Sequence, residues 1–494
     1  MSDEKTSNEK EKKPQDTAPA RRTIPDEPPV ETQHTITLDG RTLAYTAAAG
    51  IIPLRDPEKD EITAGIFFTA YTLNDVDDRA MRPLVFVFNG GPGSSSVWLH
   101  LGALGPRRVR MQDEGWMPAP PFRLEDNAYT WLDWADLVFI DPVGTGYSRS
   151  ADPEKAKEFW SVENDVKAVG EFIRLYLTRN KRWHSPLFLA GESYGTTRAA
   201  ALAGYLFDQG IAFNGLVLIS TVLNFQTLKF THGNDLPYIL FLPTYTATAW
   251  YHHKLPDALQ SKPLAEVLAE VEAWAASEYT VALGKGDQLA AGERAAVIER
   301  LAYYTGLEPR FIDHSDLRIA DRFFFKELLR DRRRTVGRLD SRFVGIDRLG
   351  ITEAPEFDPA MAAIMAPYTA MLYQYHREAL RYESDVKYEI LSRSVGENWE
   401  WERGKFADTS EALRSALAKN PYMKVLIAMG YYDLATPHFA TQYTLSHMGL
   451  EPSLRANITL ATYEAGHMFY LDVQSLAKLK VDVTAFAQAA LPGA

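Results

Sequence analysis

The sequence predicts an α/β fold, in which a mostly parallel sheet is covered by helices on both faces. Short, continuously apolar runs alternate with helical periodicity in the first half of the chain. This alternation is typical of parallel strands connected by helices. It stops near Asn224, gives way to mostly helical sequence until about residue 388, and returns with new apolar runs after residue 420. The predicted architecture is therefore one sheet interrupted by a helical insertion.

Composition limits the function classes. The chain has 494 residues, of which 46% are hydrophobic and 24% charged, enough for a large globular core. Its net charge of −12 and the lack of a basic stripe argue against nucleic-acid binding. Because cysteine is absent, disulfides, thiol nucleophiles and cysteine-ligated metals are excluded. No metal or cofactor is expected, and no apolar run is long enough to span a membrane.

The first 32 residues are rich in Glu, Lys, Pro and Thr, and they are predicted to form a disordered tail. They lack the apolar core of a signal peptide, which favours a cytoplasmic protein. If a native leader has been replaced, an exported protein is the alternative. The oligomeric state is left open, with a homodimer as one alternative.

The elements follow in order. Residues 35–38, 43–46 and 62–71 alternate like strands and should form an antiparallel edge of the sheet. Apolar runs at residues 84–88, 137–140, 187–190 and 216–219 should be buried parallel strands. Between them, apolar residues at helical spacing predict a helix over residues 163–178.

Residues 225–388 are predicted to be a helical cap inserted over the edge of the sheet that carries the site. Adjacent histidines, His252 and His253, occur in this segment without partners at metal-ligand spacing, so packing or surface roles are favoured. The core is then expected to comprise residues 33–224 and 389–494. Its last elements should be strands at residues 424–429 and 458–463 and a helix at residues 473–490.

A strand-like run leads into Gly191-Glu192-Ser193-Tyr194-Gly195, and an alanine-rich helix follows. Two glycines permit a turn too tight for side chains, which would hold Ser193 on a strained corner with its hydroxyl exposed. The pentapeptide alone also fits an ordinary glycine turn. Its position between a strand and a helix favours a nucleophilic serine.

Asp433 and His467 also follow predicted strands directly. The order Ser193, Asp433, His467 is that of the α/β-hydrolase fold and of neither other common triad fold. Because the carboxyl ends of parallel strands meet at one edge, the three side chains can converge there. A serine needs an imidazole to remove its proton, and the imidazole needs a carboxylate to fix its tautomer. The sequence thus predicts a Ser-His-Asp triad.

A second turn, Asn89-Gly90-Gly91-Pro92-Gly93-Ser94-Ser95-Ser96, follows the apolar run at residues 84–88. In hydrolases with a serine elbow, a loop in this place supplies half of the oxyanion hole. The elbow downstream favours that role over a plain turn.

Four motifs together resemble the serine carboxypeptidase family, in a bacterial type that lacks cysteines. They are the loop from Asn89, Asp141-Pro142-Val143-Gly144-Thr145-Gly146-Tyr147-Ser148, the elbow around Ser193, and Ala465-Gly466-His467-Met468. The similarity runs from about residue 84 to the C-terminus. It implies a carboxypeptidase that releases C-terminal residues through an acyl-enzyme on Ser193.

The resemblance also implies further site residues. The N–H groups of Gly91 and Tyr194 would form the oxyanion hole, and Asn89, Gly90 and Glu192 would hold the C-terminal carboxylate of the substrate. A carboxyl group can hydrogen-bond a carboxylate only if one of them is protonated, which favours acidic pH.

Two residues depart from the family pattern. Ser94 stands where a disulfide cysteine is usual, which agrees with the absence of cysteine and leaves the mechanism untouched. Ala103 stands where a second glutamate commonly shares a proton with the first. Without that partner, Glu192 is expected to be a weaker protonated donor at mild pH.

Three alternatives remain open. An esterase or acyltransferase would keep the chemistry and change the substrate, as Ala103 suggests. A proline-releasing aminopeptidase has a similar Gly-Gly-Pro-Gly loop, but the motif from Asp141 to Ser148 and the place of the insertion argue against it. A binding protein on a retired hydrolase fold would have a damaged triad or oxyanion loop, and the sequence has neither.

Overall fold

A computed structural model describes residues 21–491 of the protein. Within this range the central sheet has ten strands; nine follow in the order β1-β2-β3-β7-β4-β9-β10-β13-β14, and β8 pairs with β3. Their bounds are β1 Val30–Leu38, β2 Arg41–Arg55, β3 Ile62–Leu73, β4 Leu84–Phe88, β7 Asp136–Ile140, β8 Arg149–Ser150, β9 Leu187–Glu192, β10 Gly215–Ile219, β13 Lys424–Gly430 and β14 Ile458–Tyr463.

The direction of the strands agrees with the predicted architecture. β1, β2, β3 and β7 pair antiparallel in turn, whereas β7, β4, β9, β10, β13 and β14 pair parallel. The fold class predicted from the alternating apolar runs, a mostly parallel sheet with an antiparallel edge, is confirmed.

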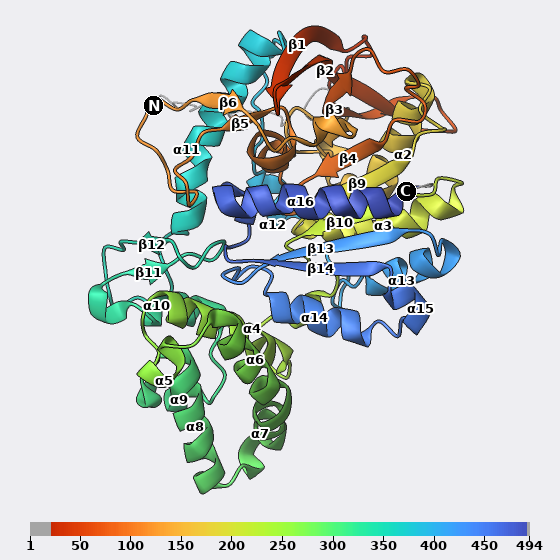
Figure 1. Ribbon diagram of the computed structural model, residues 1–494. Helices are drawn as coiled ribbons and strands as arrows, with labels where there is room; N and C mark the ends of the chain where they lie inside the picture. Colours follow the sequence, from red (N-terminus) through yellow and green to blue (C-terminus); the bar gives the residue numbers. More distant parts are fainter. Residues whose placement is uncertain (1–20, 492–494) are drawn as a thin grey trace, which may run out of the picture.

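Helices cover both faces of this sheet (Figure 1). Alternate strand residues point to opposite faces. Val85 and Val87 of β4 belong to the core that includes residues of α16, Val473–Ala490, whereas Leu84 and Phe86 share a core with helices of the other face. The helices of that second face are α2 Val162–Arg179, α3 Tyr194–Asp208 and α13 Ser410–Lys419. Strands buried on both sides explain the continuous apolar runs in the sequence.

The helical insertion forms a lobe below the sheet in the view of Figure 1. It has its own apolar cluster, which includes Tyr245, Trp274 and Phe324 and reaches Tyr432 and Leu434 of the sheet-bearing core. Its helices are α4 Leu236–Tyr251, α5 Asp257–Gln260, α6 Leu264–Trp274, α7 Thr280–Lys285, α8 Ala291–Thr305, α9 Pro309–His314 and α10 Asp321–Glu327.

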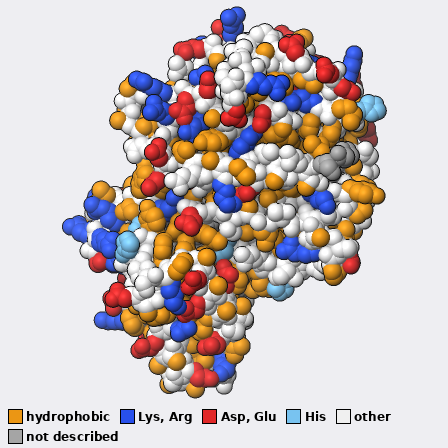
Figure 2. All heavy atoms as spheres, in the orientation of Figure 1, with side chains coloured by type: hydrophobic (Ala, Val, Ile, Leu, Met, Phe, Trp, Pro, Cys, Tyr) orange, Lys and Arg blue, Asp and Glu red, His pale blue; other side chains and the backbone are white. Residues whose placement is uncertain are grey.

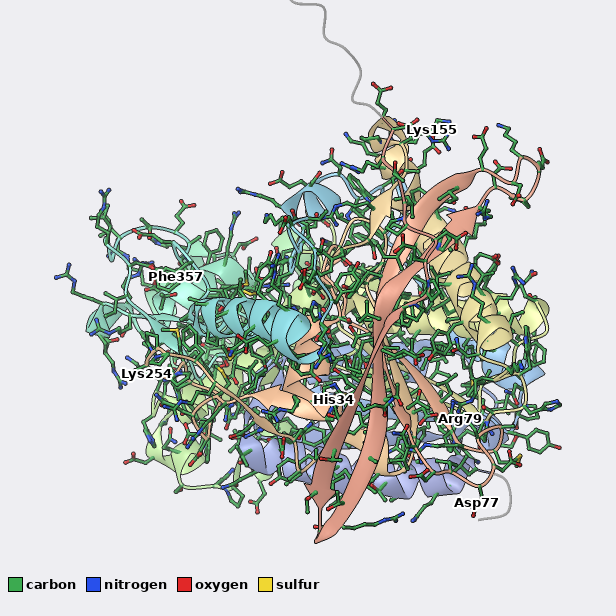
Figure 3. The ribbon with its side chains drawn as sticks, turned by 90° about the horizontal axis from the view of Figure 1, so that it is seen from above. His34, Asp77, Arg79, Lys155, Lys254 and Phe357 are labelled. Carbon is green, nitrogen blue, oxygen red and sulfur yellow. The ribbon has the colours of Figure 1, made fainter. Side chains whose placement is uncertain are left out.

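The chain then returns to the core through a short hairpin and a long helix. The hairpin pairs β11, Thr335–Val336, with β12, Val344–Gly345, and the helix is α11, Pro359–Gln374. α11 packs on the main core through Ile364, Tyr368 and Leu372. Seen from above, Lys254 and Phe357 mark the side of the insertion, and Arg79 lies on the opposite side (Figure 3).

The remaining short elements join these layers. They are α1 Val97–Leu99, β5 Arg107–Val109, β6 Leu124–Asp126, α12 Arg393–Glu397, α14 His438–His447 and α15 Pro452–Arg455. The loop predicted over residues 105–134 thus contains a small hairpin of β5 and β6.

Most of the predicted N-terminal tail, residues 1–20, lies outside the described residues. From residue 21 the chain follows the sheet: the Arg22 N–H donates to the Ala151 carbonyl over 2.7 Å, and Ile24 packs over Gly65. The predicted tail boundary at residue 32 falls inside β1, which begins at Val30. The prediction of a tail up to residue 32 relied on the average charged composition of this segment, and it overlooked that Ile24 provides an apolar side chain that packs on the sheet.

Among the described residues, no helix is both long and apolar enough to cross a membrane. Acidic and basic side chains are interspersed over the face shown in Figure 2.

A buried ion pair ties the helix after the elbow to its neighbours. The Arg198 guanidinium donates to Asp165 of α2 over 2.7 Å and to the Asn89 carbonyl over 2.8 Å. Both side chains of the pair are at most 4% exposed. Arg198 therefore links α2, α3 and the loop after β4 at one point.

Asp165→Asn is expected to lower the free energy of unfolding by about 3 kcal/mol, because it leaves the buried Arg198 charge without a counter-charge. Denaturant unfolding measures this loss. Glu171→Gln is the matched control on the same helix, since Glu171 pairs with Arg174 at the surface, and it should cost less than about 1 kcal/mol. Equal losses for the two variants would contradict the role given to Arg198.

Candidate active site

Ser193 occupies the sharp turn between β9 and α3. Its φ of 58° lies in a region that non-glycine residues rarely adopt, which is the strained corner expected from the sequence. The flanking glycines are required by contact: a Cβ on Gly191 would lie 2.3 Å from the Gly195 carbonyl oxygen, and one on Gly195 would lie 2.9 Å from that of Phe88. The turn therefore exposes the serine at the carboxyl end of the sheet.

The loop after β4 packs directly against this turn. A Cβ on Gly90 would lie 2.4 Å from the Tyr194 nitrogen, so only glycine permits the approach. Among the described residues, neither the Gly91 N–H nor the Tyr194 N–H donates a hydrogen bond. Two free donors beside the Ser193 turn are the arrangement that stabilises an oxyanion.

Asp433 and His467 are hydrogen-bonded. His467 Nδ1 lies 2.7 Å from Asp433 Oδ2, and the carboxylate also accepts from Thr436 Oγ1 over 2.6 Å and from the N–H groups of Ala435 and Thr436. Asp433 is fully buried, and its pKa lies below the usual value: burial alone would raise it, but the His467 charge and these hydrogen bonds outweigh burial. An ionised Asp433 keeps the proton on Nδ1 and leaves Nε2 as the acceptor.

The pKa of His467 is raised. Burial opposes the charged ring, but the negative charges of Asp433 and Glu192 and the hydrogen bond that His467 donates to Asp433 overcome it, while Arg338 acts in the opposite direction. The imidazole is thus a stronger base than an isolated histidine.

A hairpin from the insertion holds both residues of this pair. The His467 N–H donates to the Leu339 carbonyl over 2.5 Å, and the Leu434 N–H donates to that of Arg338 over 3.0 Å. Asp340, paired with Arg342, accepts from the Gly466 N–H. On the other side, Ser220 Oγ donates to the His467 carbonyl. The positions of His467 and Asp433 therefore depend on the segment between β11 and β12.

Ser193 and His467 line one cavity of about 340 Å³ together with Asn89, Gly90 and Gly91. Glu192 also lines it, as do Trp98, Leu339, Met361 and Leu391. Among the described residues, no hydrogen bond joins Ser193 Oγ to the His467 ring. In hydrolases without substrate, the distance between nucleophile and base is often long, and it shortens when substrate binds. The cavity thus brings together residues predicted from three separate parts of the sequence, the loop after β4, the turn after β9 and the loop that carries His467.

Glu192 is buried and hydrogen-bonded by a residue from the far end of the chain. The Tyr470 hydroxyl donates to Glu192 Oε2 over 2.5 Å. Burial raises the pKa of Glu192 to about 7, against the lowering effects of His467 and of the Tyr470 hydrogen bond. Burial, helped by the negative charge of Asp433, thus keeps the pKa of Glu192 near neutral although Ala103 stands where a second glutamate is common.

Asn89 anchors its own loop and keeps donors free. Its Oδ1 accepts from the Leu99 N–H over 3.1 Å, whereas its buried Nδ2 has no acceptor in hydrogen-bonding geometry among the described residues. The motif from Asp141 supports the neighbouring turn: Asp141 Oδ1 accepts from both the N–H and the hydroxyl of Ser96 over 2.8 Å.

Comparison with known proteins agrees with these motifs. Residues 55–280 match the family model described as serine carboxypeptidase. This segment, which is less than half of the chain, is therefore similar to the serine carboxypeptidase family. The pheromone-processing carboxypeptidase KEX1 of Saccharomyces cerevisiae is 33% identical over 162 residues, which are 30% of this chain and 20% of that protein. Serine carboxypeptidase-like 16 of Arabidopsis thaliana is 28% identical over 209 residues, 39% of this chain and 45% of the relative. The matches thus span less than half of either relative.

A solved structure extends the likeness to the whole fold. The crystal structure of the prohormone-processing carboxypeptidase KEX1(Δ)p from Saccharomyces cerevisiae has a TM-score of 0.56, covers 90% of this chain and 91% of its own, and is 19% identical. The fold is therefore the α/β-hydrolase fold with a helical insertion, as the order Ser193, Asp433, His467 predicted.

Beyond the family motifs, the structure adds residues that the sequence did not indicate. Thr436, Ser220 and Tyr470 contact Asp433, His467 and Glu192, and Arg338 lines the cavity. Tyr470 lies three residues after His467, but only the tertiary structure shows that it reaches Glu192. His252 is a packing residue, bonded to the Ser341 carbonyl over 2.7 Å.

Arg338→Met is expected to raise the pKa of His467, because the Arg338 charge lowers it. Only neutral His467 can accept the serine proton. When the rate at which a fluorophosphonate labels Ser193 is plotted against pH, the fall of this rate on the acid side should therefore occur at higher pH in the variant. The measurement is made at low ionic strength, where screening is weak.

Arg393→Met is the matched control. Arg393 lines the same cavity but pairs with Glu397 over 2.8 Å, so its removal should leave the acid limb in place. A limb that moves to lower pH in the Arg338 variant would contradict the electrostatic assignment.

Proposed function

We propose that this protein is a serine carboxypeptidase, which releases C-terminal residues from peptides through an acyl-enzyme. The observation that carries the proposal is one cavity lined by Ser193, by His467 with its bond to Asp433, and by the buried Glu192. A nucleophile, a base and a carboxyl group of raised pKa in one cavity fit a peptide with a free carboxylate.

In the proposed reaction, Ser193 Oγ attacks the carbonyl carbon of the last peptide bond while His467 Nε2 takes the hydroxyl proton. The N–H groups of Gly91 and Tyr194 stabilise the oxyanion, which is usually a large part of such catalysis. His467 then gives the proton to the leaving amine, and water hydrolyses the acyl-enzyme by the same steps in reverse.

The carboxylate site explains why the last residue would be chosen. Protonated Glu192 donates to the substrate carboxylate, and the free Nδ2 of Asn89 and the Gly90 backbone complete the site. Because the pKa of Glu192 is about 7, this donor is present below neutral pH and is lost as pH rises through 7. The peptide bond next to the bound carboxylate is then the one presented to Ser193.

Ala103 favours a second candidate, an esterase or acyltransferase on the same scaffold. It is a buried alanine, so no second carboxyl group stands beside Glu192 at that position. Ser193 and His467 would act in the same way, but the substrate would not be selected by a free carboxylate.

Ser193→Ala is expected to abolish covalent labelling by a fluorophosphonate probe, since it removes the hydroxyl that is proposed to attack. Intact-protein mass spectrometry measures the adduct. Ser392→Ala, which changes another serine of the cavity, should label like the wild type. Undiminished labelling of the Ser193 variant would remove the nucleophile from the proposal.

The substrate preference is tested with a blocked dipeptide as the free acid, the methyl ester and the amide. At pH 5.5 or so the free acid should be preferred, and Glu192→Gln should lower its kcat/KM by about 10- to 100-fold, the worth of a charge-assisted hydrogen bond. The same change should remove the decline of kcat/KM above neutral pH.

Hydrolysis of the ester should be much less sensitive to Glu192→Gln, because the ester carries no carboxylate. A wild-type enzyme that prefers the ester or the amide over the free acid would favour the esterase or acyltransferase instead.

A further inference from the structure

A buried group of tyrosines stands directly behind Glu192. Tyr470, in the turn after His467, and Tyr368, on α11, are both fully buried. Glu192 lines the cavity, whereas neither tyrosine is among its lining residues. The Tyr470 hydroxyl donates to Glu192 Oε2, while that of Tyr368 has no partner among the described residues. Of these two tyrosines, Tyr470 is the one hydrogen-bonded to Glu192.

Small residues make room for this pair. A Cβ on Gly102 would lie 2.6 Å from the Tyr368 hydroxyl and 3.0 Å from the Tyr470 ring. The next residue, Ala103, is buried in the same core as both tyrosines. Where the family commonly carries a second carboxyl group, this chain thus has small residues and two phenol rings.

We propose that Tyr470 is a positioning residue for Glu192. Tyr470 takes the place of a second carboxyl group, and it fixes the acid proton of Glu192 on the oxygen that faces the substrate. This inference rests on the proposed carboxypeptidase function. Glu192 Oε2 is occupied as an acceptor by the Tyr470 hydroxyl. When Glu192 is protonated, its proton is placed on Oε1, the oxygen that Tyr470 leaves free.

The difference between a tyrosine and a carboxyl partner is chemical. Burial raises the pKa of Tyr470 well above its ordinary value, so the hydroxyl stays protonated and acts only as a donor to Oε2. A carboxyl partner can give or take the shared proton. With Tyr470, the proton that titrates belongs to Glu192 alone, and its affinity is set by the surrounding groups.

Those groups come from several elements. His467, the Tyr470 hydroxyl and Asn89 favour the Glu192 carboxylate, while burial and the negative charge of Asp433 disfavour it. Tyr368 lies close enough to Glu192 for the negative charge of Glu192 to raise the pKa of the Tyr368 hydroxyl. Removing the Tyr470 hydroxyl leaves all the other groups in place, which makes a clean test.

Tyr470→Phe is the test variant. At a pH well below 7, where Glu192 is protonated in both proteins, the preference for the free-acid dipeptide over its methyl ester should fall about three- to tenfold, the worth of one neutral hydrogen bond. The midpoint above which the preference declines should also move to higher pH by about half to one unit, because a donor to the carboxylate is lost.

Tyr368→Phe is the matched control, since it removes a neighbouring buried hydroxyl that has no acceptor. Both the preference and its midpoint should stay as in the wild type. A merely structural role for Tyr470 would lower the ester and free-acid rates together and leave the midpoint unchanged, and that result would overturn the proposal.

A direct titration separates this inference from the proposed function. The protein is labelled with ¹³C at glutamate Cδ, and its carboxyl resonances are observed by NMR. The Glu192 resonance is the one missing from the spectrum of Glu192→Gln, and its position is followed as pH is changed. In Tyr470→Phe its midpoint should rise, whichever substrate the enzyme takes. An unchanged midpoint would refute the Tyr470 contact, whereas a raised midpoint in an enzyme without free-acid preference would refute only the carboxypeptidase function.

Discussion

The close approach of the loop after β4 to the turn after β9 is the constraint on which the site depends. Gly90 brings its backbone within contact of the Tyr194 nitrogen, which sets the two free N–H groups beside Ser193. Arg198 secures the approach from behind, because one guanidinium binds both the loop carbonyl of Asn89 and the carboxylate of Asp165. A larger residue at Gly90 would collide with the Tyr194 nitrogen and push the loop away from the Ser193 turn.

The helical insertion does more than cover the site. Its hairpin supplies the carbonyls of Leu339 and Arg338 to the loops that carry His467 and Asp433, and Asp340 fixes Gly466. The hydrogen-bonded pair of Asp433 and His467 is therefore held between the sheet and the insertion. The links from Leu339 and Arg338 are backbone hydrogen bonds, so they do not depend on the side chains of those two residues.

Glu192 illustrates how burial can replace a partner. Desolvation disfavours its charged form, and together with the smaller effect of the Asp433 charge it brings the pKa to about 7 although Ala103 carries no carboxyl group. The site can then combine a neutral acid at Glu192 with an ionised Asp433 within one buried cluster. The two carboxyl groups differ because Asp433 receives a histidine charge and four hydrogen bonds, whereas Glu192 receives mainly the Tyr470 hydroxyl.

The sequence by itself determined the sheet, the serine turn and the order Ser193, Asp433, His467. These features are local: apolar runs mark the strands, and glycines mark the turns that only glycine can make. Other features depended on residues far apart in the chain, namely the pairing of Tyr470 with Glu192, the support of His467 by Leu339 and the pKa of Glu192. Those contacts exist only once the insertion and the C-terminal turn are packed against the sheet, because burial and hydrogen bonding between distant segments are properties of the folded chain.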